Sequence, residues 1–157
     1  LEIPGPAFGG DIDLVMIPLF IIAFRHGLGY GILSGGIFGF IKCVIGGGIG
    51  WGLPSILLDY VLAYAAVGFA GIFKGKFWAV ELSTFVGCIA RFIIHFISGV
   101  TIWSSYAEGT SVWAYSLTYN ASYMLPELII TAIGAFGIAS LFDLSSPEIK
   151  VKRKIEK

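Results

Sequence analysis

Long apolar stretches separated by short polar turns make up almost the whole chain. Most stretches approach the length of about 20 residues that an α-helix needs to cross a bilayer. The first is shorter, about 20 Å long as a helix. The pattern predicts an all-α integral membrane protein, a helical bundle with five transmembrane segments at about 12–24, 28–45, 54–73, 77–102 and 117–142.

The composition supports a membrane protein rather than a soluble domain. Of the 157 residues, 57% are hydrophobic and 13% are charged, and the mean hydropathy is +0.88. A soluble domain carries about 25% charged residues. We expect residues 1–144 to form a single transmembrane domain and residues 145–157 a basic tail. Because the chain opens on Leu1 in a loop-like stretch, we expect a missing upstream segment, and one more helix there would give six.

The basic residues predict an orientation. They gather in alternate turns and in the tail, whereas the intervening turns carry acids and aromatics. Basic loops are retained in the cytoplasm, so we expect the N-terminus of this chain outside and its C-terminus inside. The net charge is zero and the remaining bases are dispersed, which argues against a nucleic acid partner. The expected partner of the tail is the lipid bilayer with its anionic head groups. The basic residues of these turns and of the tail are Arg25, Lys74, Lys76, Lys150, Lys152, Arg153, Lys154 and Lys157.

Four ionisable side chains interrupt the apolar segments. An isolated charge there costs at least about 2.5–3.5 kcal/mol on insertion scales, so such residues often mark ligand or ion paths. Structural readings exist for each: a helix cap for Asp59, an ion pair or snorkelling for Arg91, a core position for His95, and a contact with the backbone near Pro126 for Glu127.

The spacing of these residues favours a shared site. Arg91 and His95 are four residues apart and lie on one helix face. Asn120 and Glu127 belong to a second polar stripe on the last segment, and Asp59 lies in the outer half of its own. We therefore predict one outward-facing cavity between the third, fourth and last segments.

Aromatic residues concentrate on the same predicted side. Trp and Tyr form interfacial belts at both membrane surfaces, but the predicted inner side has only Tyr30 and Trp78. Such rings beside a carboxylate predict a cage for a flat cationic ligand, with cation–π contacts of about 0.5–2 kcal/mol each. The outer group comprises Trp51, Trp103, Tyr106, Trp113, Tyr115, Tyr119 and Tyr123.

Recognisable catalytic or cofactor motifs are absent from the sequence. It has no HExxH, no GxSxG and no phosphate-binding loop, so we expect no enzyme activity, no cofactor and no metal. Cys43 and Cys88 lie inside apolar segments and are interpreted as buried small residues. An intramembrane enzyme using His95 with Asp59 or Glu127, and a passive channel, remain the alternatives from other classes.

Four strings carry a resemblance to a known family. DLVMIP with the following RHG, LLDYVLAYAAVGFAG, RFIIHFISGVTIWSSYA and YSLTYNASYMLPE resemble the thiamine-specific substrate-binding subunits (S components) of energy-coupling factor (ECF) transporters. The similarity covers residues 13–138. It implies a six-helix membrane protein that captures thiamine from outside. An energising module of one membrane coupling subunit and two ATPase subunits would then drive import.

The resemblance also implies site residues. His95, Trp103, Tyr115 and Asn120 match the family's ligand contacts, and Asp59 stands at a contact where some relatives have Glu. Tyr106 and Glu127 are added because they lie beside these, and Trp51 is added from the outer aromatic group. Arg91 is implied as a structural charge partner. The family's first helix, which docks on the energising module, is not in this chain, and Phe8 is the candidate aromatic of the family's lid loop. An S component for hydroxymethylpyrimidine or riboflavin is the alternative within the class.

Overall fold

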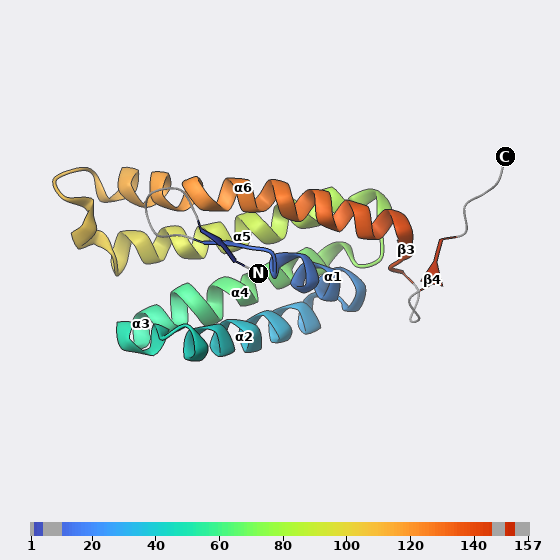
Figure 1. Ribbon diagram of the computed structural model, residues 1–157, viewed down its shortest axis with the longest axis horizontal. Helices are drawn as coiled ribbons and strands as arrows, with labels where there is room; N and C mark the ends of the chain where they lie inside the picture. The colour runs from blue at the N-terminus through green and yellow to red at the C-terminus, as the bar shows by residue number, and fades with distance from the viewer. Residues whose placement is uncertain (1, 5–10, 146–149, 153–157) are drawn as a thin grey trace.

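The computed structural model describes residues 2–4, 11–145 and 150–152. Over these residues the chain is a bundle of helices with two short antiparallel strand pairs (Figure 1). One pair joins β1 (Glu2–Pro4) to β2 (Asp11–Asp13), and the other joins β3 (Phe142–Asp143) to β4 (Lys150–Val151). Phe8 lies outside the described residues.

The helices follow one another in chain order. α1 (Met16–His26) and α2 (Leu28–Ile45) are continuous, as is the last helix, α6 (Val112–Leu141). The third segment changes type along its length, and the fourth opens with a short turn before α5. Their parts are α3 (Leu53–Ser55), η2 (Ile56–Leu62), α4 (Ala63–Ala66) and η3 (Val67–Phe73), then η4 (Phe77–Ala79) and α5 (Val80–Thr101); η1 (Gly48–Trp51) and η5 (Ser104–Ala107) are 3₁₀ turns between segments.

The predicted helical membrane fold is confirmed. Within the described residues, four helices are long and apolar enough to cross a bilayer. α1 has 11 residues and is about 17 Å long. The number of spans, predicted as five, therefore remains a prediction for this short helix.

Segment boundaries differ from the prediction in two places. α6 begins at Val112 rather than near residue 117, because the extended Ser111 ends the preceding turn and the following residues can all continue a helix. α1 begins at Met16 rather than near residue 12, because residues 11–13 pair with β1. Residues 2–4, predicted as part of a loop, therefore form a strand.

Glycines allow α2 to pack directly on the backbone of the third segment. A Cβ atom at Gly35 would overlap the carbonyl oxygen of Tyr64, and one at Gly39 would overlap that of Tyr60. Small residues permit this close approach, and packing of this kind holds helices together in lipid, where hydrophobic burial contributes little. The contact holds the third segment, which carries Asp59, in a fixed position.

Replacing Gly35 with alanine is expected to destabilise the bundle. The added methyl has no room beside Tyr64, and overpacking of this kind costs about 1–3 kcal/mol. Gly29→Ala is the matched control, because a Cβ at Gly29 on the same helix meets nothing within 4 Å. Thermal unfolding in detergent should show a lower midpoint for Gly35→Ala than for Gly29→Ala, and equal midpoints would contradict this packing.

Apolar and polar interiors occupy opposite ends of the bundle. The largest apolar cluster joins Phe20 and Phe24 of α1 to Val80, the first residue of α5, and to Ala139 near the end of α6. At the other end α1 is absent because it begins at Met16. Side chains from the remaining segments fill that end, and those described below are polar or aromatic.

Candidate functional site

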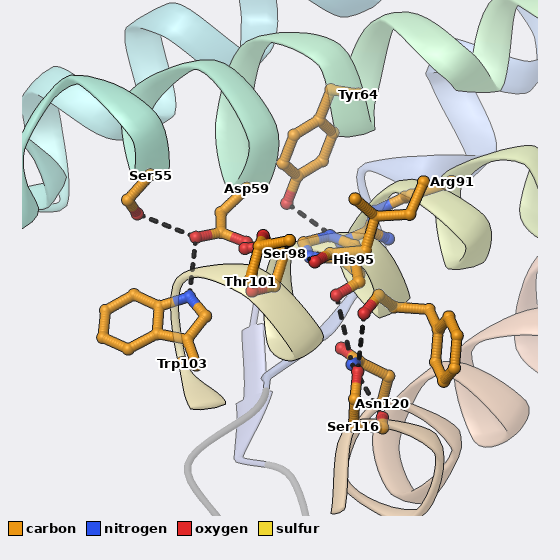
Figure 2. Close-up of polar contacts among 12 residues, drawn as sticks. Ser55, Asp59, Tyr64, Arg91, His95, Ser98, Thr101, Trp103, Ser116 and Asn120 are labelled. Atoms are coloured by element: carbon orange, nitrogen blue, oxygen red, sulfur yellow. Dashed lines mark hydrogen bonds and ion pairs between the residues drawn. The ribbon is translucent and has the colours of Figure 1, made fainter. Parts of the chain in front are cut away.

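Asp59 is the acidic centre of the polar end. It lies in η2, a π-helical stretch over Ile56–Leu62, and π-helical turns occur frequently at functional sites. Its Oδ2 accepts hydrogen bonds from Ser55 Oγ at 2.8 Å and from Trp103 Nε1 at 2.9 Å. Figure 2 shows these three side chains converging from the third segment and from the turn after α5. The carboxylate is thus held in place while Oδ1 points to another neighbour.

That neighbour is His95 on α5. Its Nδ1 lies 3.7 Å from Asp59 Oδ1, and the two side chains are 11% and 15% exposed. Within the described part of the chain, His95 Nε2 and the Oγ of Ser98, one turn further along α5, are buried without a hydrogen-bond partner. A buried polar atom left unsatisfied costs about 1–3 kcal/mol. A ligand bringing its own polar groups would remove that cost.

Asn120 links α6 to α5. Its Nδ2 donates to the carbonyl oxygen of His95 at 3.3 Å and to Ser116 O at 2.8 Å, while Tyr123 Oη donates to its Oδ1 at 2.8 Å. The neighbouring Ser116 Oγ donates to Phe96 O at 2.8 Å. Asn120 therefore fixes the backbone on which His95 stands, and its own side chain is 3% exposed.

Arg91 and Glu127 form a separate buried ion pair. Arg91 Nη1 lies 2.6 Å from Glu127 Oε2, with both side chains 3% exposed. Arg91 Nη2 also donates to Tyr64 Oη at 3.3 Å, and its Cζ lies 4.5 Å from the centroid of the Tyr64 ring. The counter-charge for Arg91 is thus Glu127, and the Glu127 carboxylate is engaged inside the protein. A role of Glu127 in ligand contact stays a prediction.

The aromatic residues form two connected chains of rings. In one, Trp51 packs on Trp103 with centroids 5.2 Å apart, and Trp103 packs on Tyr106 at 5.8 Å. In the other, Tyr115 stacks on Tyr119, which contacts Tyr123, which contacts His95 edge-on at 6.3 Å. The row of rings from Trp51 to Tyr106 reaches Asp59 through the Trp103 indole, and the row from Tyr115 to Tyr123 reaches His95. The two polar groups of the site are therefore both bordered by rings.

The residues at the two ends of the Trp51–Trp103–Tyr106 row are exposed on the surface of the protein. Trp51 and Tyr106 are 59% and 54% exposed, and Trp113, packed on Phe96, is 61% exposed. Tyr115 is half-buried. The structure joins six of the predicted residues by direct contacts: Asp59, His95, Trp103, Trp51, Tyr106 and Asn120. Tyr115 is linked to His95 through Tyr119 and Tyr123.

Several contributing residues were not predicted. Ser55 lies four residues before Asp59, and Ser98 lies three residues after His95, so helical spacing could have identified both. Lys42 inside α2 was also missed, and its Nζ lies 5.7 Å from the centroid of the Tyr64 ring. The π-helical turn around Asp59 has no signal in the sequence that we recognise.

Fold and site together define the class. The chain is a helical membrane protein. At one end of its bundle it has a partly buried polar site bordered by aromatic rings, as expected of a substrate-binding membrane component. Residues 2–145 match the family described as thiamine transporter protein (Thia_YuaJ). The chain therefore belongs to the thiamine transporter family, a family of transport proteins rather than enzymes, and the resemblance seen in the sequence is confirmed.

Individual relatives belong to the same family. The chain is 40% identical over 139 residues to the thiamine transporter ThiT of Bacillus subtilis, covering 80% of this chain and 72% of that protein. It is 30% identical over 140 residues to ThiT of Lacticaseibacillus paracasei, covering 78% and 70%. A solved structure of ThiT from Listeria monocytogenes superposes with a TM-score of 0.70 at 24% identity, covering 82% of this chain and 77% of that one. That likeness supports the fold.

Proposed function

We propose that this chain is the thiamine-binding subunit of a vitamin uptake system and that thiamine binds beside Asp59. The observation that carries the proposal is the Asp59 carboxylate, held by Ser55 and Trp103 and facing His95. The names of the relatives, thiamine transporters at up to 40% identity, support thiamine as the ligand.

The chemistry of thiamine fits these groups. Its thiazolium ring is a cation, its aminopyrimidine is flat with hydrogen-bond donors and acceptors, and its side chain ends in a hydroxyl. Asp59 supplies a negative charge or accepts from the ring amine. His95 Nε2 and Ser98 Oγ offer further polar contacts. The rings of Trp103 and its neighbours supply stacking and cation–π attraction of about 0.5–2 kcal/mol each.

The remaining predicted residues have different positions around the bound vitamin in this proposal. Trp51, Tyr106 and Tyr115 form the aromatic border of the bound vitamin. Asn120 contacts the ligand while holding the His95 backbone. Glu127 lies at the inner limit of the site, where Arg91 neutralises it.

A titration of purified protein with thiamine tests the ligand. Binding should quench tryptophan emission, since Trp51 and Trp103 both belong to the ring chain beside Asp59. Riboflavin and hydroxymethylpyrimidine should compete weakly, because neither carries a thiazolium cation. Riboflavin displacing thiamine at equal concentration would transfer the proposal to another vitamin.

The transport partner is proposed to be an ECF energising module of one membrane coupling subunit and two ATPase subunits. The sequence contains no phosphate-binding loop that could use ATP. Liposomes holding this chain alone should therefore not accumulate labelled thiamine, and addition of the module with ATP should start uptake. Accumulation by the chain alone would contradict the partnership.

The site is proposed to face outside, with the N-terminus of this chain outside and its C-terminus in the cytoplasm. The turn holding Lys74 and Lys76 lies at the bundle end opposite Asp59, as the positive-inside rule requires. Cysteines placed at the exposed positions Ser105 and Lys76 report the orientation in whole cells, because native Cys43 and Cys88 are buried. A membrane-impermeant thiol reagent should label the first and spare the second.

Replacing Trp103 with phenylalanine is expected to weaken thiamine binding about 10- to 100-fold. An aromatic ring is kept, but the indole N–H that holds Asp59 Oδ2 is lost, and hydrogen bonds to charged groups contribute about 1.5–3 kcal/mol. Trp113→Phe is the control, because Trp113 packs on Phe96 and is not bonded to Asp59. Titrations monitored by calorimetry should separate the two, and equal affinities would remove the indole N–H from the site.

A further inference from the structure

An apolar groove runs along the outside of the bundle, away from the Asp59 site. It has a volume of about 430 Å³ and lies between the α4–η3 segment and α5. Its walls include Ala66, Phe69, Phe85, Ile89, Ala90 and Ile93. Phe69, Phe85 and Ile93 are 42%, 50% and 50% exposed. Both walls belong to helices that are long and apolar enough to span a membrane, so the groove opens toward hydrocarbon rather than water.

One end of this groove is basic. The turn that connects its two walls is Lys74-Gly75-Lys76, and both lysines are exposed. Since η3 ends at Phe73 and η4 begins at Phe77, any long molecule lying between the walls has this turn at one end. Trp78, 75% exposed, stands beside it as an aromatic side chain suited to the membrane interface.

The dimensions agree with one leaflet of a bilayer. α5 rises 1.5 Å per residue, so Phe85 and Ala90 lie about 8 and 15 Å along it from Val80, and Ile93 lies about 5 Å beyond Ala90. The hydrocarbon core is about 30 Å thick, or about 15 Å per leaflet. A molecule with its head at the lysines would thus extend through the leaflet on that side to the middle of the membrane.

We propose that the groove is a binding site for an anionic phospholipid of this leaflet. One acyl chain lies between Phe69 and Phe85, and the phosphate head group is bound by Lys74 and Lys76. The lining residues that the structure describes are all apolar, which suits an alkyl chain. The positive charges of Lys74 and Lys76, with Lys152 Nζ 3.8 Å from the centroid of the neighbouring Phe77 ring, select an anionic head group over a zwitterionic one.

Glu81 carries a charge of the opposite sign to the lysines and therefore gives a second test. It lies in the first turn of α5, is exposed, and precedes Phe85 by four residues, so both share a helix face. Its negative charge weakens the attraction of the turn for an anionic head group. Removing that charge should therefore strengthen lipid binding, whereas removing a lysine should weaken it.

Native mass spectrometry of the purified protein with phosphatidylglycerol and phosphatidylcholine measures the preference. The wild type should retain phosphatidylglycerol over phosphatidylcholine. Lys74→Gln and Lys76→Gln should each lower that preference about fivefold, and Glu81→Gln should raise it. Lys150→Gln, in β4, is the control for total charge and should change nothing. Equal retention of the two lipids by the wild type, or an unchanged preference in the double Lys74→Gln/Lys76→Gln variant, would overturn the proposal.

Variants of the walls test the groove itself. Ala90→Phe fills it and should reduce lipid retention, whereas Ala132→Phe, also half-buried but on α6, should not. Phe85→Ala removes one wall and should also weaken retention, which provides a second result if Ala90→Phe does not fold. Phe136→Ala on α6, where Phe136 is 50% exposed like Phe85, is its control. Wall variants that keep the lipid but lose a cross-link to a coupling subunit would overturn the proposal and assign the groove to a protein helix.

Discussion

Thiamine affinity should fall about 30-fold or more when Asp59 is replaced by asparagine. Loss of a buried, hydrogen-bonded charge partner costs about 2–5 kcal/mol, and each 1.4 kcal/mol is tenfold. Asparagine keeps an oxygen for Ser55 and Trp103, so the geometry of the third segment is preserved while the negative charge is removed. Calorimetric titration of the purified variant measures the change.

Two comparisons make this result specific to Asp59. Glu108→Gln removes another acid at the same end of the bundle, from an exposed turn before α6, and should bind thiamine as the wild type does. Thermal unfolding of Asp59→Asn without thiamine should stay close to that of the wild type. Wild-type affinity in Asp59→Asn would remove this carboxylate from the site.

Breaking the Arg91–Glu127 pair should give the largest loss of stability. Both side chains are 3% exposed and 2.6 Å apart. Removing one partner of a buried pair costs about 3–5 kcal/mol, because the remaining charge loses the group that neutralised it. Glu127→Leu should therefore lower the thermal unfolding midpoint sharply in detergent, and Glu127→Gln should lower it less.

The double variant Arg91→Met/Glu127→Leu is the decisive comparison. Replacing both charges with apolar groups of similar size is often neutral or stabilising, so the double variant should be more stable than Glu127→Leu alone. If the double variant lost as much stability as Arg91→Met and Glu127→Leu lose in sum, the ion pair would not be what holds α5 to α6 here. A thiamine titration of the stable double variant then asks whether Glu127 also contacts the ligand.

Much of the site was predictable because helical spacing fixes which residues share a face. Arg91, His95 and Ser98 follow one another at four and three residues on α5. A charged residue in an apolar segment is also easy to recognise as a candidate site residue, since a charge is costly there. These two rules place Asp59 and His95 on interior faces without coordinates, and the positions of the apolar stretches indicate which helices carry them.

Partner choice was not predictable from the same rules. Glu127 is 36 residues from Arg91 in the chain, and the sequence spacing equally allowed it to face a ligand. Which carboxylate lies opposite Arg91 depends on the depth at which α5 and α6 meet. Contacts such as Asn120 to the His95 carbonyl set that depth.

Local backbone geometry was the other unpredictable element. The third segment reads as one uniform apolar helix, yet it contains a π-helical stretch at Ile56–Leu62 followed by η3. A π-helix changes the angle between successive side chains, so it alters the direction in which Asp59 points. The glycine contacts of α2 with Tyr60 and Tyr64 constrain the same stretch from outside, and tertiary packing of this kind is invisible in a single sequence.

The structure of the protein with thiamine bound, at a resolution that places both rings, tests the central claim most directly. We expect the vitamin within hydrogen-bond reach of Asp59, with Trp103 and His95 beside its rings. Thiamine found at the opposite end of the bundle, or bound without contact to Asp59, would contradict the account.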